Sequence, residues 1–537
     1  MQKLSHFLLS VLTGSVLLLG SCTSQVREQE AIDTAGATTA EKPVSLWPKG
    51  VTYEIFVRAF ADSDGDGIGD IAGMTAKLDY LQDLGVEAVW LMPIMPSPTY
   101  HKYDVTDYYG IDPEYGTMED FKNFLAEAHK RNIKVVIDYV INHSAQEHPW
   151  FQQAAKDKNS PYRGFYVWAT DQEVQRRGAT REATADSQER NPWHKVPGSP
   201  ERYYGYFWAG MPDLNYDNPK VKEEMFKIGR YWLTEVGVDG FRLDAAKHIF
   251  PDGEEEKNHA FWVDFRREMA AAKPDVYLVG EVWDKAEVVA PYLKGLPALF
   301  NFDLGYAITR AVQAERDTAL AANHKRIRDY YNGITSDFID ATFLTNHDQN
   351  RIMSELNGNE GRARMAASLL LTLPGAPYLY YGEEIGMLGK KPDPQIREPF
   401  LWGHTGEQEM NTAWTEAQHT TPQTVVPANE QLQDPNSLLH HYKNLIAARR
   451  SSEVLTLGEL ALTRIRNPQV TSFYRVHKGE ALLVLHNLSG TNQEVELKEQ
   501  EAGFSKVHFS TADQAAVRQG RITLPGYSSV ILNILKK

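Results

Sequence analysis

Short apolar runs alternate with amphipathic stretches along most of the chain from Trp47 onward. Such runs predict β-strands, and apolar positions three or four residues apart predict helices between them. Regular alternation of eight strands with helices is typical of the (β/α)₈ or TIM barrel, a fold of the α/β class. The predicted strands are 53–60, 86–93, 133–140, 238–243, 276–280, 298–302, 338–344 and 377–381.

Two of the intervening helices carry terminal signals. Apolar residues within 71–81 are spaced as one face of a helix, and Gly85 follows as a stop signal. A second helix around 121–128 is preceded by Thr117 and Asp120. We expect these two side chains to form a capping pair at its first turn.

Two segments depart from the alternation. Residues 144–217 contain many aromatic and polar positions and few helix signals, which predicts a loop-rich insertion after the third strand. In residues 456–537 short alternating runs replace helices and predict a C-terminal all-β domain, a β-sandwich. The barrel would then be formed by residues 44–143 and 218–455.

The segment before the barrel has a different character. Residues 1–21 combine an early lysine with an apolar stretch too short to cross a bilayer comfortably, as in a lipoprotein signal peptide. Leu19-Gly20-Ser21-Cys22 resembles the bacterial lipobox, whose cysteine is lipid-modified, and residues 22–43 are typical of a flexible tether. We therefore expect an extracytoplasmic bacterial lipoprotein, membrane-anchored at Cys22 and facing the periplasm or the cell exterior. A cysteine buried in an N-terminal membrane anchor is the alternative.

The composition of the chain excludes several classes of protein. The chain has 537 residues and a formal net charge of −15 that is spread along its length. The lack of a basic stripe argues against nucleic acid as a partner. The 42% of hydrophobic residues and 24% of charged residues are ordinary for a globular protein. A single cysteine excludes an intramolecular disulfide and cysteine-based zinc motifs.

Ionisable residues follow four of the predicted strands at the point where each strand ends. In a parallel barrel the carboxyl ends of all strands share one face, so we expect these side chains to converge on one mouth. A structural role for each of them is the alternative. The four endings are Asp138-Tyr-Val-Ile-Asn142-His143, Arg242-Leu-Asp244, Glu281 and Asn346-His347-Asp348.

Three carboxylates, Asp244, Glu281 and Asp348, would meet at this mouth. Cleavage of a glycosidic bond needs paired carboxyl groups, since one protonates the leaving oxygen while the other attacks the sugar or activates water. Arg242, two residues before Asp244, would hold that Asp ionised. Repulsion from Asp348 would raise the proton affinity of Glu281 and keep it acidic near neutral pH.

Four strings of the sequence resemble the signature regions of the α-amylase family, glycoside hydrolase family 13, and occur in the family's order. By this resemblance Asp244 is the nucleophile, Glu281 the general acid/base and Asp348 the stabiliser of the transition state. The implied route is a retaining double displacement, with the nucleophile and acid/base carboxyls about 5 to 5.5 Å apart. The strings are Asp138-Tyr-Val-Ile-Asn-His143, Gly240-Phe-Arg-Leu-Asp-Ala-Ala-Lys-His248, Gly280-Glu-Val-Trp283 and Phe343-Leu-Thr-Asn-His-Asp348.

The same resemblance implies a set of substrate-binding residues. His143, Arg242 and His347 would bind the sugar whose bond is cleaved. Lys247 and His248 would lie toward the sugar that leaves.

The segment from Ser97 to Asp104 resembles the family's loop after the second strand. There His101 would bind sugar and Tyr103 would stack on it. Lys102 departs from the glycine usual between them. Tyr100 stands where family oligo-1,6-glucosidases have an aspartate that clamps a terminal sugar, which weakens a strict exo-glucosidase interpretation.

The segment Asp62-Ser-Asp64-Gly-Asp66-Gly-Ile68-Gly-Asp70 is the best candidate for a metal site. Aspartates alternating with glycines offer several oxygen ligands on a tight loop, which suits a structural Ca²⁺. The loop resembles the family's calcium site after the first strand, where Ile68 would donate its carbonyl. A solvated acidic turn is the alternative.

The string Met211-Pro-Asp-Leu-Asn215 resembles the fifth region of the subgroup intermediate between oligo-1,6-glucosidases and neopullulanases. Together these features predict a retaining hydrolase that cleaves α-1,4-glucosidic bonds of starch, maltodextrin or malto-oligosaccharides. The alternatives are a maltogenic enzyme or transglycosylase of the same family and a non-catalytic starch-binding lipoprotein. Endo or exo action, the handling of α-1,6 bonds and the oligomeric state stay open.

Overall fold

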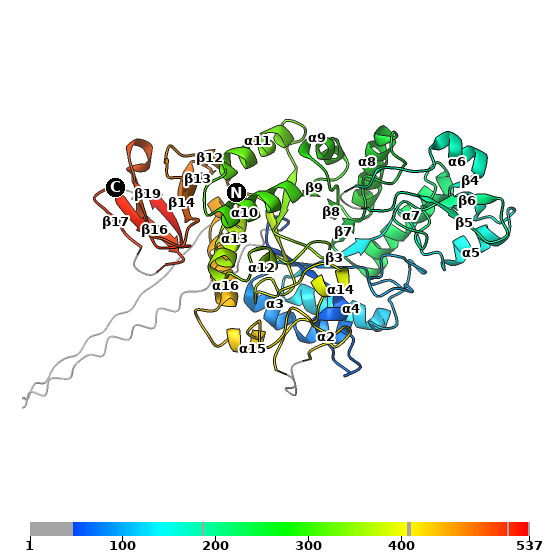
Figure 1. Cartoon of the computed structure of the whole chain (residues 1–537), viewed down its shortest axis with the longest axis horizontal. Helices are drawn as coiled ribbons and strands as arrows, with labels where there is room; N and C mark the ends of the chain where they lie inside the picture. Colours follow the sequence, from blue (N-terminus) through cyan, green and yellow to red (C-terminus); the bar gives the residue numbers. More distant parts are fainter. Residues whose placement is uncertain (1–46, 185–186, 405–409, 513–514, 535–537) are drawn as a thin grey trace, which may run out of the picture. The chain divides into compact units, whose positions relative to one another are not determined.

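The computed structural model describes residues 47–184, 187–404, 410–512 and 515–534 (Figure 1). The expected signal peptide, the anchor residue Cys22 and the tether up to residue 43 lie outside these ranges and stay predictions. Within the described ranges, no helix combines the length and apolar character that crossing a membrane requires.

Eight parallel strands close into a barrel, which confirms the predicted fold class. Each strand is hydrogen-bonded to the next around the ring, and β11 pairs with β1 to close it. In order around the barrel the strands are β1 (Thr52–Ile55), β2 (Ala88–Leu91), β3 (Lys134–Tyr139), β7 (Gly240–Leu243), β8 (Tyr277–Gly280), β9 (Ala298–Phe300), β10 (Ile339–Phe343) and β11 (Ala376–Tyr380).

Two predicted strands were too long. The run 53–60 forms a strand only up to Ile55, and helix α1 (Val57–Phe60) follows it. The run 298–302 ends as a strand at Phe300, because Phe302 begins a helix. Both segments are buried, and an apolar run without periodicity does not distinguish a buried strand from a buried helix.

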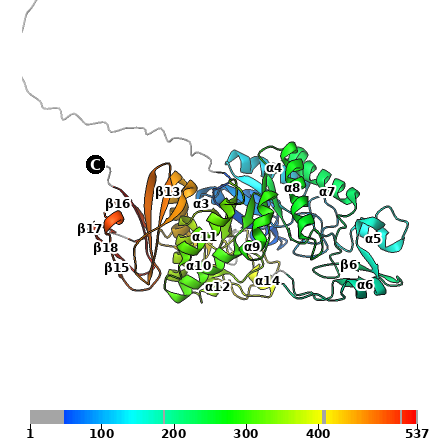
Figure 2. The same ribbon diagram turned by 90° about the horizontal axis from the view of Figure 1, so that it is seen from above.

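Helices join successive barrel strands, and Figures 1 and 2 both show α7 next to α8. The helices of the barrel domain are α2 (Ile71–Ala76), α3 (Leu78–Leu84), α4 (Met118–Lys130), α7 (Pro219–Tyr231), the π-helical turn η2 (Trp232–Val236), α8 (Glu255–Ala272), α9 (Ala286–Val289), η3 (Ala290–Lys294), α10 (Phe302–Ala314), α11 (Leu320–Asn332), α12 (Ile352–Glu355), α13 (Glu360–Thr372), α14 (Asp393–Ile396), α15 (Ala428–Gln431), α16 (Leu438–Arg450) and α17 (Glu453–Leu457).

Both predicted helices begin or end at the expected residues, but one of them is divided in two. Thr117 and Asp120 form a capping box at the start of α4, as predicted. The helix expected over 71–81 is divided into α2 and α3 at Lys77, and Gly85 ends α3 with a left-handed φ of 93°. Glycine adopts this conformation without strain, which is why it ends helices so often.

The insertion after the third barrel strand contains a small antiparallel sheet, β4-β6-β5. It has more helix than the sequence indicated, because Thr170 and Glu173 form a second capping box that starts α6. Figure 2 shows α5, α6 and β6 gathered together. Its elements are α5 (Pro149–Lys156), η1 (Arg163–Phe165), β4 (Trp168–Thr170), α6 (Asp171–Arg177), β5 (Trp193–Lys195) and β6 (Glu201–Tyr204).

Two antiparallel sheets form the C-terminal region, in the orders β12-β13-β14-β19-β16 and β15-β18-β17. Leu483 and Leu485 of the first sheet share one apolar cluster with Val495 and Ile522 of the second, so the sheets pack face to face. The elements are β12 (Glu459–Leu462), β13 (Val470–His477), β14 (Glu480–Asn487), β15 (Gln493–Glu496), η4 (Glu499–Glu501), β16 (Phe504–Ser510), β17 (Val517–Arg518), β18 (Arg521–Leu524) and β19 (Ser529–Ile534).

Candidate active site

The barrel register places two carboxylates side by side. Leu243 of β7 pairs with Gly280 of β8, so the next residues, Asp244 and Glu281, leave the barrel at the same level. Ala245 then adopts a left-handed φ of 48° and points its N–H at Glu281 Oε2, 3.3 Å away. A non-glycine residue in this conformation is uncommon and is often found at functional sites.

A cavity of about 610 Å³ opens at the carboxyl ends of the barrel strands. It brings together all three predicted catalytic carboxylates and three of the predicted substrate-binding residues. The residues that line it are His101, Tyr103, His143, Gln188, Phe207, Trp208, Met211, Asp244, Glu281, Trp283, Asp348, Lys391, Asp393 and Arg397.

Arg242 connects the carboxylates below this cavity. Its Nη1 lies 2.5 Å from Asp244 Oδ1 and 3.0 Å from Asp138 Oδ1, and its Nη2 lies 2.8 Å from Glu281 Oε2. The guanidinium is buried, so it is weakly screened by water. Because one planar group donates a hydrogen bond to Asp244 and forms an ion pair with Glu281, it fixes the position of each relative to the other.

The pKa of Glu281 is raised to about 7, mainly by burial; Arg242 opposes this shift, and the charges of Asp244 and Asp348 add to it. The predicted repulsion from Asp348 is therefore real but is not the largest contribution, since loss of hydration outweighs it. Glu281 thus holds a proton near neutral pH, as a general acid must.

The pKa of Asp348 is lowered, whereas that of Glu281 is raised. Burial alone would raise its pKa, but the charges and hydrogen bonds of His347 and the charge of Arg397 hold the pKa well below its usual range. His347 Nε2 lies 3.1 Å from Asp348 Oδ2, and its Nδ1 lies 2.5 Å from Glu54 Oε1. Burial would lower the pKa of His347, but Asp348 and Glu54 raise it to about 10. The result is a carboxylate that lines the cavity and an imidazolium buried directly beneath it.

The other predicted substrate-binding residues differ in position. Arg242 and His347 are buried beneath the cavity wall and contact the carboxylates. Lys247 lines a separate hollow beside Trp283. His248 is absent from the lining of either cavity, because its ring stacks on Tyr206 with centroids 3.8 Å apart.

Arg397 also lines the cavity, although no sequence pattern marks it. Its Nη2 donates to Asp348 Oδ1 at 2.9 Å and to Asp393 Oδ2 at 3.1 Å. Its Nε donates to the carbonyl of His347 at 2.9 Å. No strand end marks this residue, since it lies in the long connection after β11, where periodicity gives no signal.

Lys102 occupies a position that favours glycine. Its φ is 65°, in the left-handed region, which explains the glycine expected there. Its buried ammonium lies 2.9 Å from Asp112 and 2.6 Å from Glu114. These ion pairs offset the backbone strain, and the loop still brings His101 and Tyr103 to the cavity.

Three of the four aspartates in the loop after α1 lie close together. One carboxylate oxygen from each of Asp62, Asp64 and Asp70 lies within 4.8 Å of the others. Asp66 is not part of this group, and its Oδ1 accepts a hydrogen bond from Ile68 N at 2.7 Å. Three convergent carboxylates form an oxygen-only donor set of the kind that Ca²⁺ prefers.

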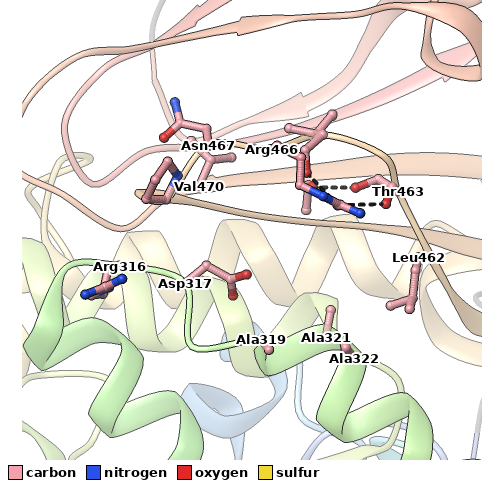
Figure 3. Close-up of a pocket in the computed structure, with 13 residues that line it drawn as sticks. Arg316, Asp317, Ala319, Ala321, Ala322, Leu462, Thr463, Arg466, Asn467 and Val470 are labelled. Carbon is pink, nitrogen blue, oxygen red and sulfur yellow. Dashed lines mark hydrogen bonds between the residues drawn. The ribbon is translucent and has the colours of Figure 1, made fainter.

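A second hollow of about 560 Å³ lies between the α10–α11 connection and strands β12 and β13 (Figure 3). Asp317 is the one carboxylate among its described lining residues, and none of those residues is aromatic. This hollow therefore lacks the paired carboxyls that glycosidic cleavage needs.

The model of the α-amylase catalytic domain matches residues 54–458, which include all of the barrel strands except the first two residues of β1, and every residue that lines the cavity. The chain belongs to the α-amylase family. A second family model, the C-terminal domain of the α-amylase SusG, matches residues 470–531. The barrel, the C-terminal sheets and the cavity carboxylates are thus those of a glycoside hydrolase of this family.

Similar proteins are matched over nearly their whole length. "Alpha-amylase 3" of Dictyoglomus thermophilum is 42% identical over 90% of this chain and 93% of its own. A "4-alpha-glucanotransferase" of Thermotoga neapolitana is 34% identical over 82% of this chain and 96% of its own. The crystal structure of an α-amylase from H. orenii superposes with a TM-score of 0.83 at 44% identity, covering 90% of this chain and 99% of that one.

Proposed function

We propose that this protein hydrolyses α-1,4-glucosidic bonds of starch or malto-oligosaccharides with retention of anomeric configuration. The observation that carries the proposal is the single guanidinium of Arg242, which contacts both Asp244 and Glu281 beside a cavity that Asp348 also lines. An ionised group and a protonated group held next to each other are what double displacement needs.

In the first step Glu281 gives its proton to the glycosidic oxygen while Asp244 forms a bond to the anomeric carbon. The bond between that carbon and the leaving sugar breaks, and a covalent glycosyl-enzyme forms. In the second step Glu281, now ionised, takes a proton from water, whose oxygen bonds to the anomeric carbon and releases Asp244. The two inversions together retain the configuration.

Asp348 and its partners would stabilise the charge that develops on the sugar. The transition state resembles an oxocarbenium ion, which a fixed carboxylate stabilises most strongly in a water-poor cavity. His347 and Arg397 keep Asp348 ionised and fix its orientation.

The test is a time course of products from soluble starch, pullulan and maltotriose. We expect reducing sugar from starch, and in Asp244→Asn a loss of turnover of roughly 10³-fold or more with an unchanged thermal midpoint. The wild-type protein releasing no reducing sugar from starch or maltodextrin would contradict the proposal and favour a non-catalytic glucan-binding protein.

Transglycosylation is a second candidate, and the relative named as a 4-α-glucanotransferase favours it. Here a sugar hydroxyl replaces water in the second step. Oligosaccharides longer than the substrate, formed from maltoheptaose, would support this candidate, whereas only shorter products would support hydrolysis.

We also propose that Asp62, Asp64 and Asp70 hold a structural Ca²⁺, with Asp66 and the carbonyl of Ile68 as further ligands by resemblance. Asp62 is buried, and the backbone N–H groups of Gly65 and Gly67 fix its carboxylate at 2.7 and 2.8 Å. Ca²⁺ at a hundred times its Kd would stabilise the folded state by about 2.7 kcal/mol. Chelation should lower the thermal midpoint of the wild type and have less effect on Asp64→Asn, with the exposed Asp79→Asn as control.

The location of the protein is a further proposal. A lipid-anchored enzyme outside the cytoplasm would act on glucans before their uptake. Cells expressing the full chain should incorporate labelled palmitate into the wild type and not into Cys22→Ser. Equal labelling of the two proteins would rule out Cys22 as the anchor.

A further inference from the structure

A small cavity lies at the end of the barrel opposite the catalytic mouth. Lys49 precedes β1, Gly375 precedes β11, and Asp340 is the second residue of β10, so the cavity is at the amino ends of these strands. Arg328 of α11 and Gly458, which follows α17, also line it. Its volume of about 10 Å³ is room for a single species of about the size of a water molecule.

Two cationic side chains of this wall have unused hydrogen-bond donors. Arg328 is buried; its Nη2 donates to Glu459 at 2.9 Å, and its Nη1 lies 3.5 Å from Asp340 Oδ2. Its Nε is buried and has no hydrogen-bond partner among the described residues. Lys49 is partly buried and, between described residues, forms neither a hydrogen bond nor an ion pair. Both groups therefore have N–H donors available to a ligand in the cavity that they line.

Two further guanidinium groups lie directly behind the wall. Arg449 donates to the carbonyl of Gly375 at 2.5 Å, and Arg475 donates to the carbonyl of Gly458 at 2.7 Å. Both arginines are buried, and in the described part of the chain all of their hydrogen-bond acceptors are carbonyl groups. Each of these positive charges is thus one wall residue away from the cavity and has no carboxylate bound to it.

The positive charges around the cavity outnumber the negative ones. The pKa of the Lys49 ammonium is lowered, mainly by burial and by the charge of Arg328; Glu459 opposes this shift, and the two arginines behind the wall add to it. Four cationic groups therefore share the carboxylates of Asp340 and Glu459. The charge of Glu87 also acts on Arg449, but that carboxylate lies 3.5 Å from the guanidinium of Arg450, so the excess remains.

Asp340, the carboxylate of the wall, already has partners on both oxygens. Its Oδ1 accepts a hydrogen bond from Asn301 Nδ2 at 2.9 Å, and its Oδ2 lies 2.8 Å from His324 Nε2. These contacts hold Asp340 in place, so the unused donors of Lys49 and Arg328 are the groups that a ligand would meet.

An excess of buried positive charge calls for a counter-ion. A guanidinium does not give up its proton inside a protein, so the two arginines behind the wall stay charged. A buried charge without compensation is costly to fold. The size of the cavity favours a monatomic anion over sulfate, phosphate or an organic carboxylate.

We propose that this cavity binds one small monovalent anion, such as chloride, between the ammonium of Lys49 and Nε of Arg328. The bound anion compensates the excess charge where the barrel meets β12 and β13, the strands that carry Glu459 and Arg475. The site lies at the other end of the barrel from the catalytic cavity, and the inference does not depend on the proposed function.

The first test measures the thermal midpoint of the wild type as chloride replaces gluconate at constant ionic strength. Gluconate is too large for the cavity, so it serves as the reference anion. Because a ligand of the folded state stabilises it, the midpoint should rise with chloride and level off, by about 2 to 3 °C at a hundredfold excess over the Kd. Equal midpoints in the two salts would overturn the site.

Lys49→Met removes the ammonium and keeps most of the apolar stem. The chloride concentration that gives half of the rise should increase about tenfold in this variant, because one of two charged contacts is lost. Lys122→Met is the matched control, since Lys122 is exposed on α4 and does not line the cavity. It should keep the wild-type dependence. The same dependence in Lys49→Met would place the chloride effect elsewhere and overturn the site.

Bromide gives a direct test that needs no variant. Crystals of the wild type soaked in bromide should show an anomalous-scattering peak in the cavity, within hydrogen-bond distance of Lys49 Nζ and Arg328 Nε. A cavity that holds water alone, with no anomalous peak, would overturn the proposal. Neither measurement uses activity, so a failure of the proposed function would not alter either result.

Discussion

At the scale of single residues, Glu281 and Asp348 line one cavity but differ in how strongly each holds a proton. Glu281 keeps its proton mainly because it is buried, whereas Asp348 loses its proton because His347 and Arg397 lie against it. The difference arises from neighbours and not from residue type, since both are carboxylic acids with similar intrinsic pKa values.

This difference leads to a prediction about pH. Glu281 acts as an acid only while protonated, and its pKa is raised to about 7, so kcat/KM on maltoheptaose should fall as pH rises through about 7. Maltosyl fluoride needs no protonation of its leaving group, so its first step should lack this alkaline decline. A decline of the same size on both substrates would remove Glu281 as the general acid.

A second prediction concerns Arg397 as a positioning residue for Asp348. Arg397→Met removes the 2.9 Å contact to Asp348 and the contact to the His347 carbonyl. Because displacement of a reacting group by about 1 Å can reduce rate about 100-fold, kcat on maltoheptaose should fall by roughly that factor while KM changes less. Arg397→Lys keeps the charge and should recover part of kcat. Wild-type kcat in the Met variant would show that Asp348 is held by His347 alone.

Sequence predicted the residues at strand ends and missed those in long connections. Asp244 and Glu281 were predictable, because strand ends of a parallel barrel meet at one face. His248 belongs to the same string, yet it stacks on Tyr206 of the insertion. That packing depends on a contact between segments distant in sequence, which no local pattern reports.

At the scale of elements, the strands were predicted well and their ends less well. The run 53–60 was predicted as one strand because burial on both sides removes the alternation that separates strand from helix. Within the predicted β-domain, residues 521–534 form two strands, β18 and β19, separated by a turn that includes Gly526. The Pro525-Gly526 pair was a visible turn signal in the sequence.

The segment after β11 leads to a prediction about stability. Burial raises the pKa of Glu383 to about 8, the neighbouring Glu384 raises it too, and a hydrogen bond from Tyr442 at 3.0 Å lowers it. The folded state therefore keeps a proton that the unfolded chain releases. Protonated Glu383 makes its full contribution to the free energy of unfolding below the unfolded pKa of about 4.3. This contribution is lost as pH rises toward 8, by at most about 1.4 kcal/mol per pH unit.

Glu383→Gln carries no titrating group at this position. The thermal midpoint of the variant minus that of the wild type should therefore increase from pH 5.5 to pH 8. Comparing the two proteins cancels the contributions of other buried acids, which are present in both. A difference between the two midpoints that does not vary with pH would mean that Glu383 is ionised in the folded protein.

At the scale of the whole described body, the barrel and the C-terminal sheets are joined by buried polar contacts. Arg475 of β13 donates to the carbonyl of Thr372, the last residue of α13, and to the carbonyl of Gly458 at 2.7 Å. His486 of β14 lies 2.9 Å from the Thr372 hydroxyl. The sequence indicated a separate β-domain but gave no sign of this junction, because a lone arginine in a strand is usually exposed.

The last prediction tests whether the two parts unfold together. Arg475 satisfies the carbonyl of Thr372 at the C-terminal end of α13 and that of Gly458 after α17, and a positive charge at a helix C-terminus is also favourable to the helix dipole. Arg475→Met leaves these buried acceptors without a donor and should reduce the free energy of unfolding by about 2 to 4 kcal/mol. Lys506→Met, on the exposed face of β16, is the control and should have little effect.

Calorimetry distinguishes the outcomes. If Arg475 couples the two parts, the wild type should unfold in one transition, and Arg475→Met should lower the midpoint or separate a second transition for the C-terminal sheets. Activity on maltoheptaose below the first transition should persist, because the catalytic cavity lies at the other end of the strands, where Asp244 and Glu281 leave the barrel. A variant that melts as one unit at the wild-type midpoint would mean that apolar packing alone, through residues such as Phe473 and Leu482, joins the sheets to the barrel.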